Sequence, residues 1–363
     1  MKIFRKRSAA GLAGSSLDRL AWRRFCKNPL SIASMVVIGL VALVALLGYL
    51  ITPDHTPYCN QQYLELATLK PGSKASFLCV SNTDSSFIIH HSSLERMLHG
   101  SPLPYTATPI TDYSIAHDSI FATPYNGDAI AVPASQARVQ ERTFVLGTDG
   151  YGRDVLSMIM IGSRVSLSVG FIAVLIALLL GITLGALAAY YGGWVDNLIM
   201  WIINVVWSIP TVLLVIAITF VLGKGFWQIF IAVGLTMWVD IARVVRGEVF
   251  SIKEKEFIEA TRALGFSTFR TIFRHILPNI AGAVVVVAAS NFASAILLEA
   301  GLSFLGIGVQ PPMPSWGMMV KENYGYILLD SAYLAFLPGL AIMLVVLAFM
   351  LLANGLRDAL DVK

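Results

Sequence analysis

The sequence predicts an all-α membrane protein with six transmembrane helices, cytoplasmic N and C termini, and a long extracytoplasmic insertion between helices 1 and 2. The first observation behind this prediction is composition: 56% of the 363 residues are hydrophobic and only 13% are charged. A soluble domain carries about a quarter charged residues. The other two observations are the length of the apolar runs and the placement of the lysines and arginines.

Six apolar runs are long enough for a helix to cross a bilayer, which takes about 20 residues. They cover residues 30–51, 165–190, 198–222, 227–245, 280–305 and 332–353. The first run is too long for the core of a signal peptide, and no small-x-small cleavage site follows it, so we expect an uncleaved anchor. Gly181 and Gly185 have the spacing of close helix packing, and Pro210 is expected to kink the third run.

Basic residues gather in the tail 1–29, in the segment 246–279 between the fourth and fifth runs, and in the C-terminal tail. With six spans these segments fall on one side, and the positive-inside rule makes that side the cytoplasm. The stretch 17–27 reads either as an amphipathic helix on the inner leaflet or as a plain charged flank. A net charge of +4 does not suggest a nucleic-acid partner.

The segment 52–142 is rich in Ser, Thr, Pro, Asp and His and is an extracytoplasmic loop or small domain in this topology. Its composition is compatible with a folded cap, with a docking surface for a soluble partner, and with a mostly irregular chain. Two strand-like runs, 119–122 and 129–132, flank Asn126 and Gly127, which suit a hairpin turn. The tail 1–29, helix 1 at 30–51 and a helical core at 143–363 complete the predicted organisation.

Three cysteines are present, none of them in a CxxC pair. Cys59 and Cys79 lie in the insertion, and therefore in an oxidising compartment, so we hypothesise a disulfide between them. It would close a loop of about 20 residues and add roughly 3 kcal/mol to stability. Cys26 lies on the cytoplasmic side and is expected to stay reduced. No His/Cys cluster has metal-ligand spacing, so no metal site is predicted.

The basic segment 246–279 has the pattern of two short helices; the alternative is a polar loop that merely joins two spans. Its first part combines a charged face with small or apolar positions such as Ile258 and Ala260, which permit close packing against another protein. Gly265 can adopt the backbone conformation that ends a helix. Pro278 is expected to stop the second helix before the fifth run.

This segment resembles the EAA loop of membrane subunits in binding-protein-dependent ABC importers, which reads Glu-Ala-Ala, three residues, Gly, nine residues, then Ile-x-Leu-Pro. The matching positions are Glu259, Ala260, Gly265, Leu277 and Pro278. Thr261 replaces the second Ala, and His275 stands where the Ile is expected. The resemblance implies a coupling helix that docks in a groove on a cytoplasmic ATPase, where Glu259 makes polar contacts and Ala260 and Gly265 allow close approach.

Motifs elsewhere narrow the resemblance to one type of subunit. They read LGTDGYGRD at 146–154, YYGGWVD at 190–196, FRHILPN at 273–279, LSFLGIGVQPP at 302–312, SWG at 315–317 and GLRDALD at 355–361. In this order they resemble the C-type permease subunit of the dipeptide/oligopeptide/nickel ABC importer family. The match covers the N-terminal tail, the first span and everything from about residue 146 onward. The insertion is longer than expected for the family, and nothing in it is carried over.

The resemblance implies a multi-pass protein of the bacterial inner membrane that forms the channel of an ATP-driven importer for di- or oligopeptides. Its partners would be a second homologous permease, two cytoplasmic ATPase subunits that bind ATP and Mg, and an extracytoplasmic substrate-binding protein. Nickel, opines and other small solutes are alternative cargoes in the same family. Two rival interpretations are an ATPase-independent secondary transporter or channel, and a membrane-anchored sensor that works through the insertion.

The chain shows no catalytic site of its own. It has no GxxxxGKS/T phosphate loop and no triad, so we expect neither a cofactor nor enzymatic activity in this chain. Glu299, Asn204 and Asn291 are polar residues inside apolar runs, where they mark a translocation path or hydrogen bonds within the bundle. Asp240, near the end of the fourth run, is explained by a local pair with Arg243.

Overall fold

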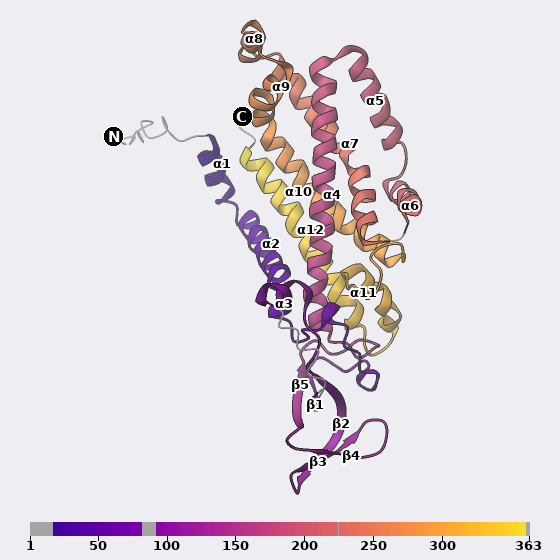
Figure 1. Cartoon of the computed structure of the whole chain (residues 1–363). Coiled ribbons are helices and arrows are strands. Elements are labelled where there is room, and N and C mark those ends of the chain that lie inside the picture. Colours follow the sequence, from indigo (N-terminus) through magenta and orange to yellow (C-terminus); the bar gives the residue numbers. More distant parts are fainter. Residues whose placement is uncertain (1–16, 82–91, 224, 361–363) are drawn as a thin grey trace, which may run out of the picture.

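The computed structural model describes residues 17–81, 92–223 and 225–360, which form a helical bundle with a β-sheet at one end (Figure 1). Five described helices are long and apolar enough to cross a membrane. They are α2 (Pro29–Leu47), α4 (Val155–Tyr191), α7 (Phe226–Lys253), α10 (Leu277–Phe304) and α12 (Tyr333–Leu360). Shorter helices are α1 (Leu17–Phe25), α3 (Ser93–His99), α8 (Glu256–Ala263), α9 (Thr268–Arg270) and α11 (Trp316–Asn323).

The third predicted run is not a straight span. It folds as α5 (Gly193–Trp207) and α6 (Thr211–Leu222), which are bent by 93° relative to each other. The kink predicted at Pro210 is confirmed, but it is a complete break, because Pro210 has no N–H to donate and its extended backbone begins α6. The described chain has six spans only if this bent pair counts as one.

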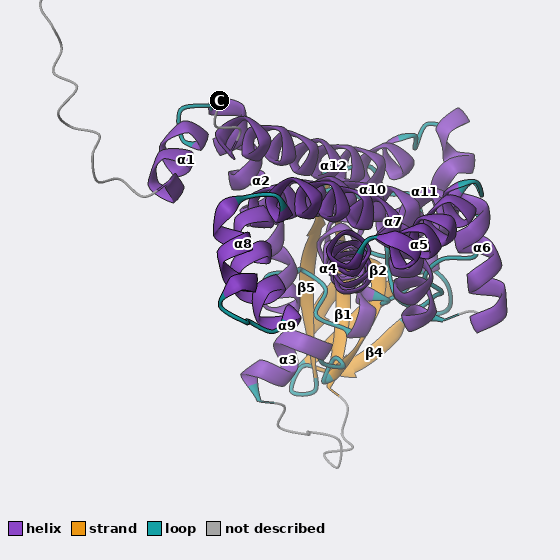
Figure 2. Ribbon diagram, turned by 90° about the horizontal axis from the view of Figure 1, so that it is seen from above, coloured by secondary structure: helices purple, strands orange, loops and turns teal. Residues whose placement is uncertain are grey.

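Helix α4 begins at Val155, ten residues before the predicted start of the second run at 165. The cause is a cap at Asp154, whose carboxylate accepts a hydrogen bond of 2.9 Å from the Ser157 N–H. The helix therefore continues beyond its apolar run as a 37-residue rod. Viewed end-on, α4 lies near the middle of the bundle (Figure 2).

The crossing of α4 and α7 depends on small residues. A Cβ atom on Gly181 would lie 2.6 Å from Cβ of Ile241, and one on Gly185 would lie 2.5 Å from the carbonyl oxygen of Ala242. Neither distance is compatible with a side chain, so the two backbones approach as closely as glycine allows. The close packing predicted from the spacing of Gly181 and Gly185 is confirmed.

The insertion contains a five-stranded antiparallel sheet of order β4-β3-β2-β1-β5, so the prediction of an all-α chain is wrong in this segment. The strands are β1 (Ser73–Ser81), β2 (Tyr105–Ala116), β3 (Ser119–Pro124), β4 (Ile130–Pro133) and β5 (Ala137–Phe144). The alternation of β1 explains the sheet, because Phe77 packs into one small core and Leu78 into another on the opposite face. The predicted hairpin is confirmed as β3–β4, with Ile120 opposite Val132.

The hypothesised disulfide is wrong: Cys59 and Cys79 are both free and buried. They belong to different cores, because Cys59 packs against the helical bundle and Cys79 against Phe77 in the sheet. The Cys59 thiol lies 3.1 Å from the carbonyl oxygen of Asp54. Burial raises the pKa of both thiols, which keeps them protonated and unreactive toward disulfide exchange.

The ends of the bundle differ in character. Helices α1 and α8 and the end of α12 lie at one end, and the sheet lies at the other (Figure 1). Residues 17–25 of the basic stretch form α1, which packs on α12 and buries Phe25. The described parts of the three segments that the charge distribution placed on one side therefore lie at one end of the molecule.

Arg164 on α4 joins the first long helix to the insertion. Its guanidinium donates hydrogen bonds to the carbonyls of Ala45 (2.9 Å) near the end of α2, and of Leu98 (2.8 Å) and Met97 (3.0 Å) near the end of α3. The last carbonyls of a helix have no partner within the helix, so one side chain completes two helix ends. Its Cζ also lies 5.4 Å from the centre of the Tyr49 ring.

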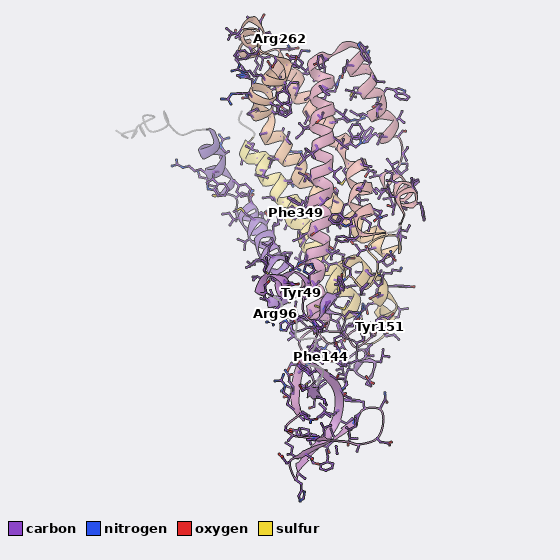
Figure 3. The ribbon with its side chains drawn as sticks, viewed as in Figure 1. Tyr49, Arg96, Phe144, Tyr151, Arg262 and Phe349 are labelled. Carbon is purple, nitrogen blue, oxygen red and sulfur yellow. The ribbon has the colours of Figure 1, made fainter. Side chains whose placement is uncertain are left out.

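Arg164→Lys is expected to loosen α3, because an ammonium keeps the charge but lacks the planar fork that reaches both helix ends. Trypsin should then cut the purified protein after Arg96 on α3 faster than it cuts the wild type. Figure 3 shows Arg96 and Tyr49 close together at this end of the bundle. Arg142→Lys on β5, which loses a bond of 3.2 Å to the Tyr105 hydroxyl, is the control. Equal cleavage rates at Arg96 in both variants would contradict this role.

Candidate functional site

The segment that resembles an EAA loop folds as α8, a turn at Gly265, and α9. Helix α8 ends in a Schellman motif, in which Phe266 N–H donates to the Thr261 carbonyl (3.1 Å) and Gly265 N–H to the Arg262 carbonyl (2.9 Å). Gly265 has φ +70°, which residues with a Cβ rarely adopt. The predicted short first helix and its end at Gly265 are therefore confirmed.

One side of α8 is anchored and the other is open. Ile258 is fully buried among the core residues of the bundle, and Thr261 is buried with its hydroxyl donating to the Ile258 carbonyl (2.7 Å). Glu259 and Ala260 point outward and are exposed. The same segment carries four large exposed apolar side chains: Phe257, Leu264, Phe269 and Phe273. We call these six exposed residues the α8 face; an apolar patch rimmed by polar residues is typical of a protein interface.

Pro278 does not stop the second helix, contrary to the prediction. Residues 268–304 form one helical run, in which Thr271–Ile276 is a wide π-helical turn. Leu277, which is half-buried, and Pro278, which is exposed, then begin α10. A proline in the first turn of a helix forfeits no needed N–H, and the wide turn before it accommodates its ring. The α8 face is therefore directly continuous with a long helix of the bundle.

Basic side chains tie α8 and α7 to neighbouring helix ends. Lys253, at the end of α7, donates to the Ala189 (3.0 Å) and Tyr190 (2.7 Å) carbonyls at the end of α4. The guanidinium of Arg262 on α8 lies 5.6 Å from the centre of the Tyr190 ring, and Figure 3 shows Arg262 at the end of the bundle opposite the sheet. These contacts connect α8 with the central rod α4.

Helix α5 is connected to the same end by a bidentate ion pair. Arg246 Nε lies 2.6 Å from Asp196 Oδ1, and Arg246 Nη2 lies 2.7 Å from Asp196 Oδ2. Such paired bonds fix both distance and orientation. Neither this pair nor the Lys253 contacts were anticipated, because the partners are about 50 and 64 residues apart in sequence.

Glu299 lies inside the bundle and is fully buried. Ser166 on α4 and Ser303 on α10 donate hydrogen bonds of 3.0 and 2.7 Å to its carboxylate. The Ser303 hydroxyl also accepts a bond of 3.2 Å from the Val309 N–H. Glu299 therefore holds the turn after α10 against α4, which favours the bundle role over the translocation path.

The two asparagines make the predicted hydrogen bonds between helices. Asn291 on α10 donates to the Met237 carbonyl on α7 (3.3 Å). Asn204 on α5 accepts from Arg243 Nη2 on α7 (3.0 Å). Arg243 Cζ also lies 3.8 Å from the centre of the Trp207 ring, so this guanidinium points toward α5. The local pair expected between Asp240 and Arg243 is not among the ion pairs of the described residues.

A cavity of about 600 Å³ lies where α5 and α6 bend beside α7 and α10. Its polar lining comes from three helices: Thr211 lies on α6, Thr236 and Asp240 lie on α7, and Asn291 and Ser294 lie on α10. Most of the remaining lining is apolar. Glu299 and Asn204 do not line it, so of the three predicted polar residues only Asn291 reaches this space.

The structure also brings together a buried charge cluster that the sequence did not indicate. Arg153 Nη2 lies 2.6 Å from Asp149 Oδ2 and 2.6 Å from Glu322 Oε2. Asp149 also accepts hydrogen bonds from the Tyr151 and Arg153 N–H groups (both 2.9 Å). The cluster fastens the loop before α4 to α11. The sequence signal was the 146–154 motif, but its partner Glu322 is 169 residues away.

Two family models match this chain. Residues 181–363 match the family described as binding-protein-dependent transport system inner membrane component. Residues 16–71 match the N-terminal transmembrane domain of oligopeptide transport permease C. A solved structure, "Inward facing conformations of the MetNI methionine ABC transporter", aligns with a TM-score of 0.45 and 20% identity over 56% of this chain and 94% of that one.

Two curated relatives are similar over 60% of this chain. The glutathione transport system permease protein GsiD of Pectobacterium atrosepticum is 43% identical over 218 residues, which is 60% of this chain and 72% of the relative. The dipeptide transport system permease protein DppC of Alkalihalophilus pseudofirmus is 45% identical over 217 residues, 60% of this chain and 71% of the relative. The chain is a multi-pass inner-membrane protein that belongs to the family of binding-protein-dependent transport system inner membrane components.

Proposed function

We propose that this chain is the channel-forming subunit of an ATP-driven importer and that the α8 face binds a cytoplasmic ATPase. The observation that carries the proposal is the division of α8 into an anchored and an open side. Ile258 is fully buried in the bundle, whereas Glu259 and Ala260 are exposed on a segment that carries large exposed apolar side chains. A short helix held on one side by the core and open on the other suits the transmission of force to the bundle.

The contacts of α8 supply a route for that force. Movement of α8 would act on α10 through the short turn at Gly265, because the helical run from 268 to 304 that follows the turn is continuous. Lys253 and Arg262 would pass it to the end of α4, and the ion pair between Arg246 and Asp196 would pass it to α5. Closure of the ATPases would thereby shift the bundle between two packed arrangements.

In this proposal the bent pair α5–α6 counts as one of six spans, and α1, α8 and the end of α12 lie in the cytoplasm. Residues 52–142 then face the extracytoplasmic side, where a substrate-binding protein delivers the cargo. A second homologous permease completes the channel, and two separate ATPase subunits bind ATP and Mg and carry out hydrolysis, so this chain is not an enzyme. Family membership disfavours an ATPase-independent transporter or channel.

Di- or oligopeptides are the proposed cargo, because the similar relatives are named as dipeptide and glutathione transport permeases. Nickel, opines and other small solutes are the alternatives. Deletion of this chain should abolish uptake of a radiolabelled dipeptide, and the wild-type chain supplied in trans should restore it. If the deletion strain kept its dipeptide uptake but lost its nickel uptake, the cargo would be nickel rather than a peptide. A chain that purifies in active form without any ATPase would overturn the importer.

A further inference from the structure

The cavity beside the bend between α5 and α6 contains one charged side chain. That side chain is Asp240, which projects from α7 into a space of about 600 Å³. The volume lies within the range of small-molecule sites, about 300–1,000 Å³. A carboxylate within a membrane-crossing helix is costly unless it is paired or faces water, and such residues mark ligand or ion pathways.

Asp240 has no hydrogen bond or ion pair with any residue that the structure describes. Arg243, one turn further along α7, lies close enough to attract the carboxylate but makes its contacts elsewhere. Its Nη2 donates to Asn204 (3.0 Å), and its guanidinium stacks over Trp207 at 3.8 Å. Trp207 also lines the cavity, so the ring that holds Arg243 borders the space into which Asp240 projects.

The other polar groups of the lining are suited to accept hydrogen bonds. Asn291 uses its nitrogen to donate to the Met237 carbonyl (3.3 Å), so its side-chain oxygen is left as an acceptor. The Thr236 hydroxyl donates to the Val233 carbonyl (2.8 Å) and keeps its lone pairs. A carboxylate with neutral acceptors matches an ammonium group, which has three donors and no acceptor.

We propose that this cavity binds the ammonium group of the transported solute, with Asp240 as the counter-charge. The inference rests on the proposed function, in which the ammonium is the α-amino group shared by all linear peptides. The apolar walls from α6 and α10 would contact the side chains of the peptide without selecting among them. The site therefore recognises the feature that different peptides have in common.

The first test measures the charge of the cavity without transport. In the full importer carrying C26S, the reporter S294C places a thiol in the cavity wall; Cys59 and Cys79 stay in place because they are buried. A cationic methanethiosulfonate should label this thiol faster than an anionic one. Asp240→Asn should lower that preference by about tenfold, the scale of electrostatic focusing in a charged cleft. The control Glu248→Gln changes an exposed carboxylate on the same helix outside the cavity and should leave the preference unchanged.

The second test identifies the ligand. Alanyl-alanine should slow labelling of S294C when Asp240 is present and not in the D240N variant, whereas N-acetyl-alanyl-alanine should give no protection in either. An unchanged charge preference in D240N, or no labelling by either reagent, would overturn the cation site. Equal protection by the two peptides would overturn recognition of the ammonium. Because labelling needs no uptake, a charge effect in an importer that does not transport dipeptides would reject the peptide cargo and retain the cation site.

Discussion

Gly265→Asp is expected to abolish transport while the protein remains in the membrane in normal amount. Gly265 is exposed at φ +70°, and a Cβ there would have no atom within 4 Å, so the new side chain would not disturb the bundle. Left-handed backbone costs a residue with a Cβ about 1–2 kcal/mol, less for Asp than for most residues. The large effect would come from a charged group next to Leu264 of the α8 face, where we propose that the ATPase docks. Uptake in a deletion strain and the amount of ATPase that co-purifies are the measurements.

Gly265→Ala is the matched control, because it has a similar backbone cost without the charge. It should retain most of the uptake and the bound ATPase. Glu259→Lys should also abolish transport, since it reverses the charge at the centre of the α8 face, whereas Glu259→Gln should be milder. Normal uptake in Gly265→Asp or Glu259→Lys would refute docking at α8. Equal loss in Gly265→Asp and Gly265→Ala would attribute the effect to the turn rather than to the interface.

Arg153→Met is expected to have the largest effect on stability. It leaves Asp149 and Glu322 facing each other without a counter-charge, although their side chains are only 3% and 19% exposed. Removing one partner of a buried pair costs about 3–5 kcal/mol, because a charge stays buried without compensation. The midpoint of thermal unfolding of the purified protein should fall clearly, and the loop before α4 should become sensitive to protease.

Lys70→Met provides the comparison for this second prediction. Lys70 forms a pair of 3.2 Å with Asp330, but the two side chains are 71% and 93% exposed. Exposed pairs contribute little to stability, so the unfolding midpoint should hardly change. If Arg153→Met and Lys70→Met lowered the midpoint equally, the cluster around Arg153 would not be the fastener of α11 that its geometry implies.

Short-range sequence patterns were sufficient to predict structural features that have a local cause. The cap at Gly265 was predictable because a Schellman motif involves six consecutive residues, and the close approach at Gly181 and Gly185 follows from residue size at helical spacing. Pro210 was correctly expected to disturb its helix. Pro278 was misjudged, because the same residue type is tolerated in the first turn of a helix, and the wide turn that precedes it has no distinctive composition.

In the insertion, the sequence predicted only part of the structure. Its hairpin was visible from two short alternating runs around Asn126 and Gly127, but β1 pairs with β2 and β5, which both lie far from it in sequence. The disulfide hypothesis was wrong because the compartment and the spacing of two cysteines do not show in which direction each side chain points. Cys59 faces the bundle and Cys79 faces the sheet core, so their sulfur atoms belong to separate clusters.

The sequence by itself determined the membrane class, the end at which the basic segments gather, and the position of the EAA-like segment, because hydropathy, charge and local motifs act within one helix or turn. Tertiary structure alone decided which charges meet. Arg246 pairs with Asp196, and Arg153 pairs with Glu322. Arg243 instead stacks on Trp207, so Asp240 lines the cavity without an ion pair to any described residue. Such pairing depends on the rotation and depth of packed helices, which a linear pattern does not contain.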